Sequence, residues 1–191
     1  NGHHPAIGSD AFFRVRPCYN SEGFMRYMER ICGLAVEFGA DLIHFEHLGY
    51  NAEPDTCRCA VCVASFREFL RQRYGNQDDR TRNAGKERWG HHSFTHVRPP
   101  VYPQSFGADG VPEKSPHHQD WNAFKIGALS AALGRLSRGA HKRSPECAVG
   151  CDAFRLESFA GKPDRCLLYD HLLPWLDVVD AGSDPRPIAD E

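Results

Sequence analysis

A strand, a helix and a second strand follow one another with short connections at the start of the chain. Residues 11–17 (AFFRVRP) have the Phe and Val content of a strand, and Pro17 ends it. Apolar residues then recur at helical spacing (positions 24, 28, 31, 35 and 38), between the candidate caps Asn20 and Ser21 and the stop Gly39. Residues 41–46 (DLIHFE) predict a buried strand. Such a βαβ unit implies parallel strands and a right-handed crossover.

The rest of the chain continues this alternation. Helical periodicity at 63–74 and 121–136 precedes predicted strands at 146–152 and 177–184, and a short helix that ends at Pro174 lies between those strands. Asp120 is the predicted N-cap of the helix at 121–136. Strands that alternate with helices favour a parallel α/β fold.

An α/β barrel fits this pattern better than a nucleotide-binding doubly wound sheet, because no glycine-rich phosphate loop follows any predicted strand. About four parallel strands with their helices make half of a (β/α)8 TIM barrel, which needs about 250 residues. We therefore predict that residues 1–191 are a fragment of one barrel domain, with an open sheet as the alternative. Residues 76–118, rich in Gly, Pro, His and Arg, predict a loop-rich insertion.

Charge and hydropathy argue against several classes of partner. A formal net charge of −2 gives no electrostatic reason to expect binding to nucleic acid or to an anionic membrane. No apolar run approaches the roughly 20 residues of a membrane span. The N-terminus lacks the features of a signal peptide, which favours a cytoplasmic location, and it lacks an initiator Met, as an excised piece would. The sequence leaves open whether the chain forms a homo-oligomer.

Three of the eight cysteines crowd into Cys57-x-Cys59-x-x-Cys62. Such crowding indicates a metal rather than disulfides, and thiolate is a ligand that zinc favours. One loop can supply these three ligands without a long loop closure. Cys18 is the candidate fourth ligand because it follows the first strand, and the loops after neighbouring parallel strands emerge at the same edge of the sheet.

Alternatives exist for this metal site. Asp55, His47 or water could take the fourth position, and reduced cysteines without a metal could replace the whole site. Cys32 lies in the middle of a predicted helix and is expected in the core. With four thiolates the Zn²⁺ would be structural, because no position would stay open to a substrate.

Three segments of the chain resemble the family 42 glycoside hydrolases, which are β-galactosidases with an (α/β)8 barrel. They are RPCYNSEGFMRY at 16–27, CRCAVCVASFREFLRQRYG at 57–75 and DWNAFKIGALSAAL at 120–133. The resemblance covers most of residues 14–150 and implies a segment from roughly the third to the sixth strand of a barrel of the glycosidase clan A type. It also implies a structural zinc bound by a Cys after the third strand and a C-x-C-x-x-C loop after the fourth, which supports Cys18.

The same resemblance raises a question about catalysis. The general acid/base of the family is a Glu preceded by Asn at the end of the fourth strand, in a pattern like NEYG. Counted back from Gly49, that Glu falls on His47 and the Asn on Glu46, so the Asn-Glu pair is not reproduced. Glu46 could still act as the acid/base by a shifted geometry, held by His44, which faces the same way. The alternatives are a degenerate site and polar residues without a catalytic role.

Other candidates line the same predicted barrel mouth, where barrel active sites gather. We assign substrate binding to five residues at strand ends and in the insertion: His44, His47, Trp89, Asp152 and Asp180. Trp89 could stack on a sugar ring, whereas Trp121 and Trp175 sit on apolar faces and are expected in the core. A retaining glycosidase also needs a second carboxylate about 5 Å from the first. The resemblance implies that this carboxylate follows the seventh strand, outside the chain.

Two functions therefore compete. The first is a segment of a glycoside hydrolase that acts on a carbohydrate substrate, β-galactosidase-like, with a structural zinc. The second is a divergent, non-catalytic, zinc-stabilised barrel that binds carbohydrate or serves as an interaction module.

Overall fold

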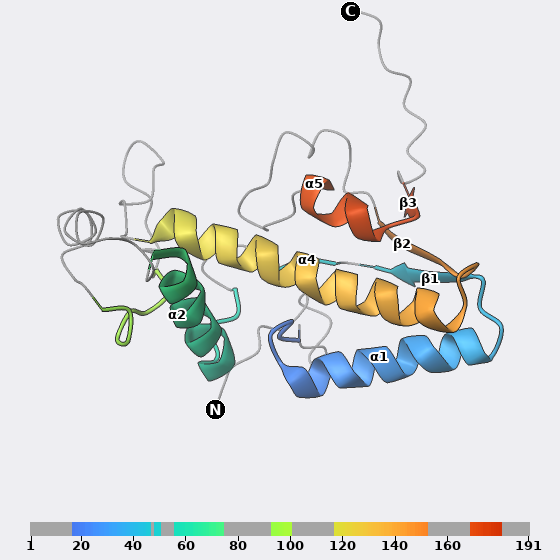
Figure 1. Ribbon diagram of the computed structural model, residues 1–191, viewed down its shortest axis with the longest axis horizontal. Coiled ribbons are helices and arrows are strands. Elements are labelled where there is room, and N and C mark those ends of the chain that lie inside the picture. Colours follow the sequence, from blue (N-terminus) through green and yellow to red (C-terminus); the bar gives the residue numbers. More distant parts are fainter. Residues whose placement is uncertain are drawn as a thin grey trace, which may run out of the picture.

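The computed structural model describes residues 17–46, 48–50, 56–74, 93–100, 117–152 and 169–180. Their helices and strands follow in the order α1 (Glu22–Glu37), β1 (Leu42–Phe45), α2 (Ala60–Tyr74), α4 (His118–Arg143), β2 (Ala148–Asp152), α5 (Tyr169–Leu172), the 3₁₀ turn η3 (Leu173–Trp175) and β3 (Val178–Asp180). Figure 1 shows the long helices α1 and α4 side by side, with α2 near the first turns of α4.

The three described strands form one parallel sheet in the order β1-β2-β3. Phe45 of β1 pairs with Cys151 of β2, and Cys151 pairs in turn with Val179 of β3. This confirms the predicted parallel strands near 41–46, 146–152 and 177–184. The strand predicted at 11–17 lies outside the described residues except for Pro17.

Helix α1 begins and ends where its sequence predicts. Ser21 is the N-cap, and its Oγ accepts a hydrogen bond from the Phe24 N–H at 3.5 Å. Gly39, just beyond the last turn, has a φ of +87°, which glycine adopts without steric cost. The connection to β1 can therefore be as short as the predicted βαβ unit requires.

The buried face of α1 differs from the predicted one. The spacing points positions 24, 28, 31, 35 and 38 toward the core, but Cys32 and Gly33 are buried while Ile31 and Phe38 are exposed. The cause is the close approach of α4, because a Cβ at Gly33 would lie 2.8 Å from Nε of Arg143. The side of α1 that carries Gly33 therefore faces α4. The predicted core position of Cys32 is confirmed.

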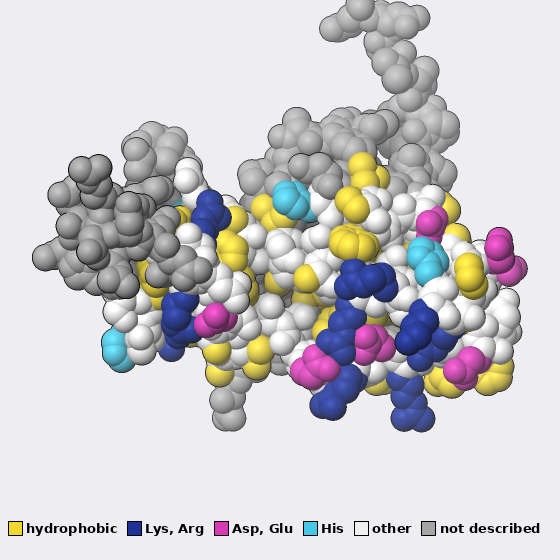
Figure 2. All heavy atoms as spheres, in the orientation of Figure 1, with side chains coloured by type: hydrophobic (Ala, Val, Ile, Leu, Met, Phe, Trp, Pro, Cys, Tyr) yellow, Lys and Arg dark blue, Asp and Glu magenta, His cyan; other side chains and the backbone are white. Residues whose placement is uncertain are grey.

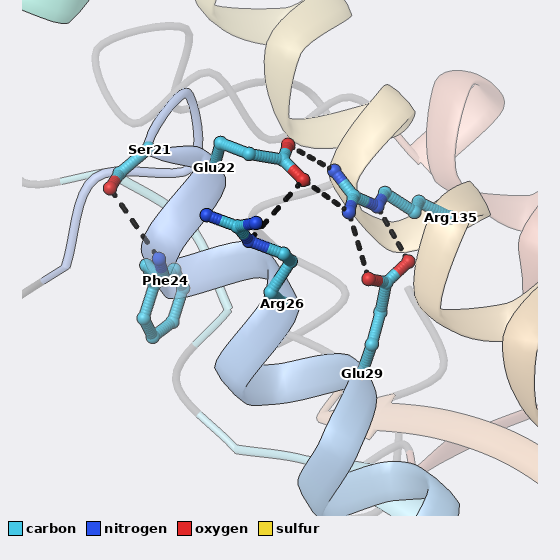
Figure 3. A network of polar contacts seen from close by, with 6 residues as sticks. All are labelled: Ser21, Glu22, Phe24, Arg26, Glu29 and Arg135. Atoms are coloured by element: carbon cyan, nitrogen blue, oxygen red, sulfur yellow. Dashed lines mark hydrogen bonds and ion pairs between the residues drawn. The ribbon is translucent and has the colours of Figure 1, made fainter.

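Arg135 of α4 fixes how the two long helices lie against each other (Figure 3). Its Nη1 and Nη2 donate to the Glu22 carboxylate at 2.6 and 2.9 Å, and its Nε and Nη2 donate to the Glu29 carboxylate at 2.6 and 2.8 Å. Hydrogen bonds from Arg135 lower the pKa of both carboxyls. Such bidentate hydrogen bonds fix the relative orientation of the two helices. Ion pairs between exposed side chains, however, add little to the free energy of unfolding. The apolar core must supply most of the stability.

That core lies between the sheet and the helices α1, α4 and α5. Its buried members include Cys32, Ile43, Leu129, Leu133, Leu136, Val149, Cys151 and Leu172. Burying one such aliphatic side chain contributes about 1.5–3 kcal/mol. The helices therefore pack on the sheet mainly through these aliphatic side chains.

The described helices cover one face of the sheet. Ile43 and Val149 point into the core, and side chains alternate along a strand, so positions 44 and 150 belong to the opposite face. Leu42 and Val178 on that opposite face are exposed. Parallel sheets are usually covered on both faces, so within the described residues this face is open.

The start of α4 differs from the sequence prediction. Asp120 is not the N-cap, because the helix begins at His118 and its cap is His117, which has a φ of +68°. Asp120 lies in the first turn instead and accepts hydrogen bonds from His117 Nδ1 at 3.0 Å and from the Tyr74 hydroxyl at 2.7 Å. Its carboxylate therefore ties the end of α2 to the start of α4, and side-chain donors take the place of the backbone amides that a cap would bind.

The remaining predictions concern single elements. Trp121 is fully buried, as predicted, and Trp175 is half-buried against the core. Most of the predicted insertion at 76–118 lies outside the described residues, which include only 93–100 and its last two positions. Among the helices that the structure describes, none has the length and apolar character to cross a bilayer.

Two glycines on α4 offer a matched test of this packing. A Cβ at Gly134 would lie 2.8 Å from the indole ring of Trp175, whereas a Cβ at Gly127 would meet nothing within 4 Å. Alanine is favoured over glycine in a helix by about 1 kcal/mol. We expect Gly127→Ala to raise the free energy of unfolding by up to that amount, and Gly134→Ala to lower it by about 1–3 kcal/mol through overpacking. Urea unfolding measures both, and equal effects would contradict the Trp175 contact.

Candidate functional site

Four cysteines from two parts of the chain meet at the start of α2. Cys18 precedes α1, and its carbonyl accepts a hydrogen bond from the Ser21 N–H at 2.9 Å. Cys57 and Cys59 lie just before α2, and Cys62 lies in its first turn. The four Sγ atoms all lie within 4.8 Å of one another. The structure therefore brings together the four cysteines that the sequence analysis grouped.

The separations between sulfurs suit a tetrahedral thiolate site. Cys18 Sγ lies 3.3 Å from Cys62 Sγ and 3.6 Å from Cys59 Sγ, and Cys57 Sγ lies 3.7 Å from Cys62 Sγ. These distances exclude disulfides, which need about 2.05 Å. Four sulfurs at about 2.3 Å from a central Zn²⁺ stand about 3.8 Å apart. These three separations are at or slightly below that value, and all four sulfurs lie within 4.8 Å of one another, so the cluster has the size of a tetrahedral thiolate site.

The crowded sulfurs also shift one another's pKa values. Hydrogen bonds from Cys18 and then Cys62 lower the pKa of Cys57 to about 2, whereas the bond to Cys57 raises the pKa of Cys18 to about 12. The pKa of Cys62 is raised as well, first by its bond with Cys18. Hydrogen bonds within the cluster thus favour the thiolate of Cys57, whereas burial and the neighbouring sulfurs oppose ionisation of Cys18 and Cys62. A bound dication would have to displace the protons of these thiols, because it binds the thiolate form.

The surroundings of the cluster are apolar and aromatic. Phe66 and Leu70 of α2 and Trp121 and Phe124 of α4 form one buried group with the cysteines. The rings of Phe66 and Trp121 meet edge to face with centroids 5.0 Å apart. The cluster is thereby built into the contact between α2 and α4, so anything that expands or opens it also disturbs that contact.

Two arginines near the cysteines were missed by the sequence analysis. Arg58 donates from Nε and Nη2 to the Pro100 carbonyl at 3.2 and 2.9 Å, and Arg67 donates from Nε to the Val97 carbonyl at 2.8 Å. They hold residues 93–100 against α2 and its preceding loop. Backbone carbonyls about 30 to 40 residues away leave no trace in the sequence. The sequence offered one signal for these contacts, because Arg58 is a charged residue between Cys57 and Cys59.

The second group of candidates lies where the strands end. His44 lies in β1, and a Cβ at Gly150 of β2 would meet its Nδ1 at 3.4 Å, so the imidazole lies over the neighbouring strand. Glu46 follows β1 directly and is exposed. Asp152 and Asp180 are the last residues of β2 and β3, and they pair with each other. His47 and Trp89 lie outside the described residues.

These acidic positions form a row across the sheet. Phe45 pairs with Cys151, and Glu46 is the turn residue directly after Phe45, so it lies at the same edge of the sheet as the paired residues Asp152 and Asp180. Neighbouring strands lie about 4.8 Å apart. The three acidic positions therefore follow one another along the edge where the strands end.

A comparison with protein families decides what kind of chain this is. Residues 8–159 match the family 42 glycoside hydrolases, described as β-galactosidase. The chain belongs to glycoside hydrolase family 42. The matched range includes all four cysteines of the cluster and both His44 and Glu46. A comparison with curated proteins gives no match.

Solved structures of β-galactosidases share the fold of this family 42 chain. The enzyme from the Antarctic haloarchaeon Halorubrum lacusprofundi is 18% identical with a TM-score of 0.61, and the match covers 92% of this chain and 26% of that one. The enzyme from Bacillus circulans sp. alkalophilus is 18% identical with a TM-score of 0.60, over 93% and 26% of the two chains. The E323A catalytic mutant of Gan42B, a β-galactosidase from G. stearothermophilus, is 18% identical with a TM-score of 0.62, and the match covers 91% of this chain and 26% of that one. The chain spans about a quarter of the length of these enzymes.

Metal content gives a direct test of the cysteine cluster. We expect about one bound metal ion per chain after purification without chelator, and its loss in Cys62→Ala, because three thiolates in an apolar site bind a tetrahedral ion less tightly than four. The matched control is Cys32→Ala, which removes an equally buried sulfur away from the cluster. Elemental analysis of both variants measures the difference. Less than about half an ion per wild-type chain, or equal loss in the two variants, would contradict the site.

Proposed function

We propose that this chain is the central part of a family 42 barrel that hydrolyses β-galactoside bonds, with residues 1–191 belonging to one (β/α)8 domain. The observation that carries the proposal is that Glu46, Asp152 and Asp180 lie at the carboxyl ends of three parallel strands. Barrel enzymes keep their active sites at this end of the strands. A sheet that the described helices cover on one face only fits a wall of such a barrel, whose second face would be closed by the remaining strands.

Glu46 is the proposed general acid/base. It is exposed and follows β1 directly, which supports a position at the mouth of the proposed barrel. Its protonated carboxyl would give a proton to the leaving glycosidic oxygen while a carboxylate outside this chain attacks the anomeric carbon. Its ionised form would then take a proton from the water that hydrolyses the glycosyl-enzyme intermediate. A retaining mechanism needs the two carboxyl groups about 5–5.5 Å apart.

The other candidates would bind the sugar. Carboxylates accept strong hydrogen bonds from hydroxyl groups, which is the role proposed for Asp152 and Asp180. His44 shares their face and is proposed to orient Glu46, because Gly150 leaves room for its ring beside β2. His47 and Trp89 are retained as proposed substrate contacts, with the Trp89 indole as a stacking surface for a sugar ring.

A structural Zn²⁺ is the proposed cofactor. Cys18, Cys57, Cys59 and Cys62 would hold it, and the supporting observation is that their four sulfurs lie within 4.8 Å of one another. When bound, the ion would cross-link the segment before α1 to the start of α2. Four thiolates fill a tetrahedral site, so the ion would take no part in bond cleavage.

A second function is favoured by one observation. The Asn-Glu pair of the family is replaced by Glu46 and His47 in the alignment that Gly49 anchors. A chain that has lost the acid/base would be a zinc-stabilised barrel that binds carbohydrate or a protein partner without hydrolysis. The two functions differ in whether the Glu46 carboxyl is needed for turnover.

Replacing that carboxyl separates the two functions. In the full-length protein we expect Glu46→Gln to lower kcat for an alkyl β-galactoside about 10²–10⁴-fold, because the amide cannot donate a proton to a basic leaving group. The matched control is Glu146→Gln, an exposed carboxylate before the opposite end of β2. Steady-state kinetics and the circular dichroism of each variant measure activity and folding.

Each outcome has a distinct reading. Unchanged turnover in a folded Glu46→Gln would remove Glu46 from the mechanism. A wild-type protein that binds galactosides without hydrolysing them would favour the non-catalytic function. A similar loss in the Glu146 variant would show that the effect is not specific to the strand-end row.

A further inference from the structure

Arg58 belongs to the loop that carries three of the four clustered cysteines, but its side chain reaches out of that loop. Its Nη1 donates to the Thr56 carbonyl at 3.5 Å, inside the loop. Its Nε and Nη2 donate to the Pro100 carbonyl at 3.2 and 2.9 Å, 42 residues further along the chain. Its guanidinium carbon also lies 6.0 Å from the centre of the Trp121 ring. One side chain thus joins the cysteine loop to a distant segment.

That segment, residues 93–100, is a strap against α2 and the start of α4. Figure 1 shows the strap in light green beside both helices. Its Phe94 is 9% exposed, and the centroid of the Phe94 ring lies 6.0 Å from that of Tyr74, at the end of α2. The same centroid lies 6.0 Å from that of His117, which caps α4. Ring packing outside the cysteine loop therefore anchors the first half of the strap.

Two arginines hold the second half of the strap. Arg67 of α2 donates from Nε to the Val97 carbonyl at 2.8 Å, and Arg58 supplies the two bonds to Pro100. Pro100 is buried, and a proline has only its carbonyl for backbone hydrogen bonding. If Arg58 turned away, this buried residue would lose both donors, which is costly for a polar group away from water. Docking of the strap therefore depends on the direction of the Arg58 side chain.

The cysteines on both sides of Arg58 control that direction. Residues 56–59 belong to no helix or strand, so regular secondary structure does not fix the backbone of Arg58. If both neighbouring thiolates bound one ion, this backbone would be held at two points. Without the ion the loop gains conformational freedom, and keeping the guanidinium in place then costs more entropy. A bound ion would thus favour the docked strap.

We propose that Arg58 is a positioning residue that links metal binding at the four cysteines to docking of the strap. The inference rests on the proposed Zn²⁺ site and adds a consequence to it. Linkage is reciprocal, so an ion that favours docking is itself bound more tightly when the strap is docked, by the same factor. Such couplings change affinity by about 5–150-fold. The strap is therefore docked in the metal-bound protein and released when the ion leaves.

Removal of Zn²⁺ from the full-length protein tests one direction of this linkage. Hydrogen exchange read by mass spectrometry follows the strap, where the Val97 N–H donates to the Phe94 carbonyl at 3.3 Å. We expect exchange in the strap to become at least about tenfold faster after chelation, and exchange at 129–136, in the core between α4 and the sheet, to stay unchanged. Unchanged exchange in the strap after the ion has left overturns the proposal. Equal acceleration in both segments overturns it too, because loss of the ion then unfolds the whole protein.

Arginine variants test the other direction, with a chromophoric chelator that competes for Zn²⁺ and so measures its dissociation constant. Arg58→Ala and Arg67→Ala each remove bonds to the strap, and neither residue is a candidate ligand. We expect the dissociation constant to rise about tenfold in Arg58→Ala and less in Arg67→Ala. The matched control is Arg71→Ala, because Arg71 is an exposed residue of α2 that pairs with Glu68. Figure 2 shows such Lys and Arg side chains at the surface over α2.

Two variants separate a linkage through the strap from simpler effects. Arg67 lies more than a helical turn beyond Cys62, so Arg67→Ala reaches the ion only through the strap. Unchanged Zn²⁺ affinity in a folded Arg67→Ala with faster strap exchange overturns the proposal. Arg58→Lys keeps the charge but not the paired bonds to one carbonyl, so wild-type affinity in that variant overturns the positioning role.

The remaining outcomes separate this inference from the proposed cofactor. A wild-type protein that binds Zn²⁺ without any link to the strap contradicts this inference alone. A wild-type protein that binds no Zn²⁺ contradicts the proposed cofactor and the inference together. Equal weakening of Zn²⁺ binding in Arg71→Ala overturns the role of the strap. Circular dichroism checks the folding of each variant, and the chelation experiment on the wild-type protein needs none of them.

Discussion

Four sulfur atoms that crowd within 4.8 Å of one another join two parts of the chain that α1 and β1 separate. Cys18 belongs to the segment before α1, and the other three belong to the start of α2. Hydrogen bonds within the cluster favour the thiolate of Cys57 and raise the pKa of Cys18 and Cys62. Phe66 and Trp121, which meet edge to face, belong to the same buried group as the cysteines. The position of α2 thus depends on the contacts of this buried group, and Asp120 ties the end of α2 to the start of α4.

The parallel sheet gives the candidate site its geometry. Its register pairs Asp152 with Asp180, and Glu46, which follows β1 directly, lies at the same edge although more than 100 residues separate it from Asp152 along the chain. The same alternation that buries Ile43 and Val149 under the helices assigns His44 to the other face. A strand whose helix-facing residues are apolar and whose terminal residues are acidic is expected when one face packs in a core and one end meets a polar ligand.

Much of this could be predicted from the sequence, because it depends on local pattern. Helix caps, the alternation of elements and parallel pairing follow from short-range spacing, and the topology alone suggested that Cys18 would approach Cys57 to Cys62. The features that the sequence analysis did not predict correctly depend on partners that are distant in the sequence. Asp120 has the composition of an N-cap, but its partner Tyr74 is 46 residues away. Arg58 and Arg67 bind carbonyls that no side-chain pattern marks.

The error on α1 has a physical explanation. The apolar positions chosen by spacing, 24, 28, 31, 35 and 38, straddle two stripes, one facing the core and one facing outward. A helix with a single apolar partner needs a single stripe, and an amphipathic pattern then identifies its buried face. In a helix with apolar residues on two sides, spacing alone does not identify which side is buried. The packing of α4 and the sheet against α1 decides it, and this packing buries Cys32 and Gly33 and leaves Ile31 and Phe38 exposed.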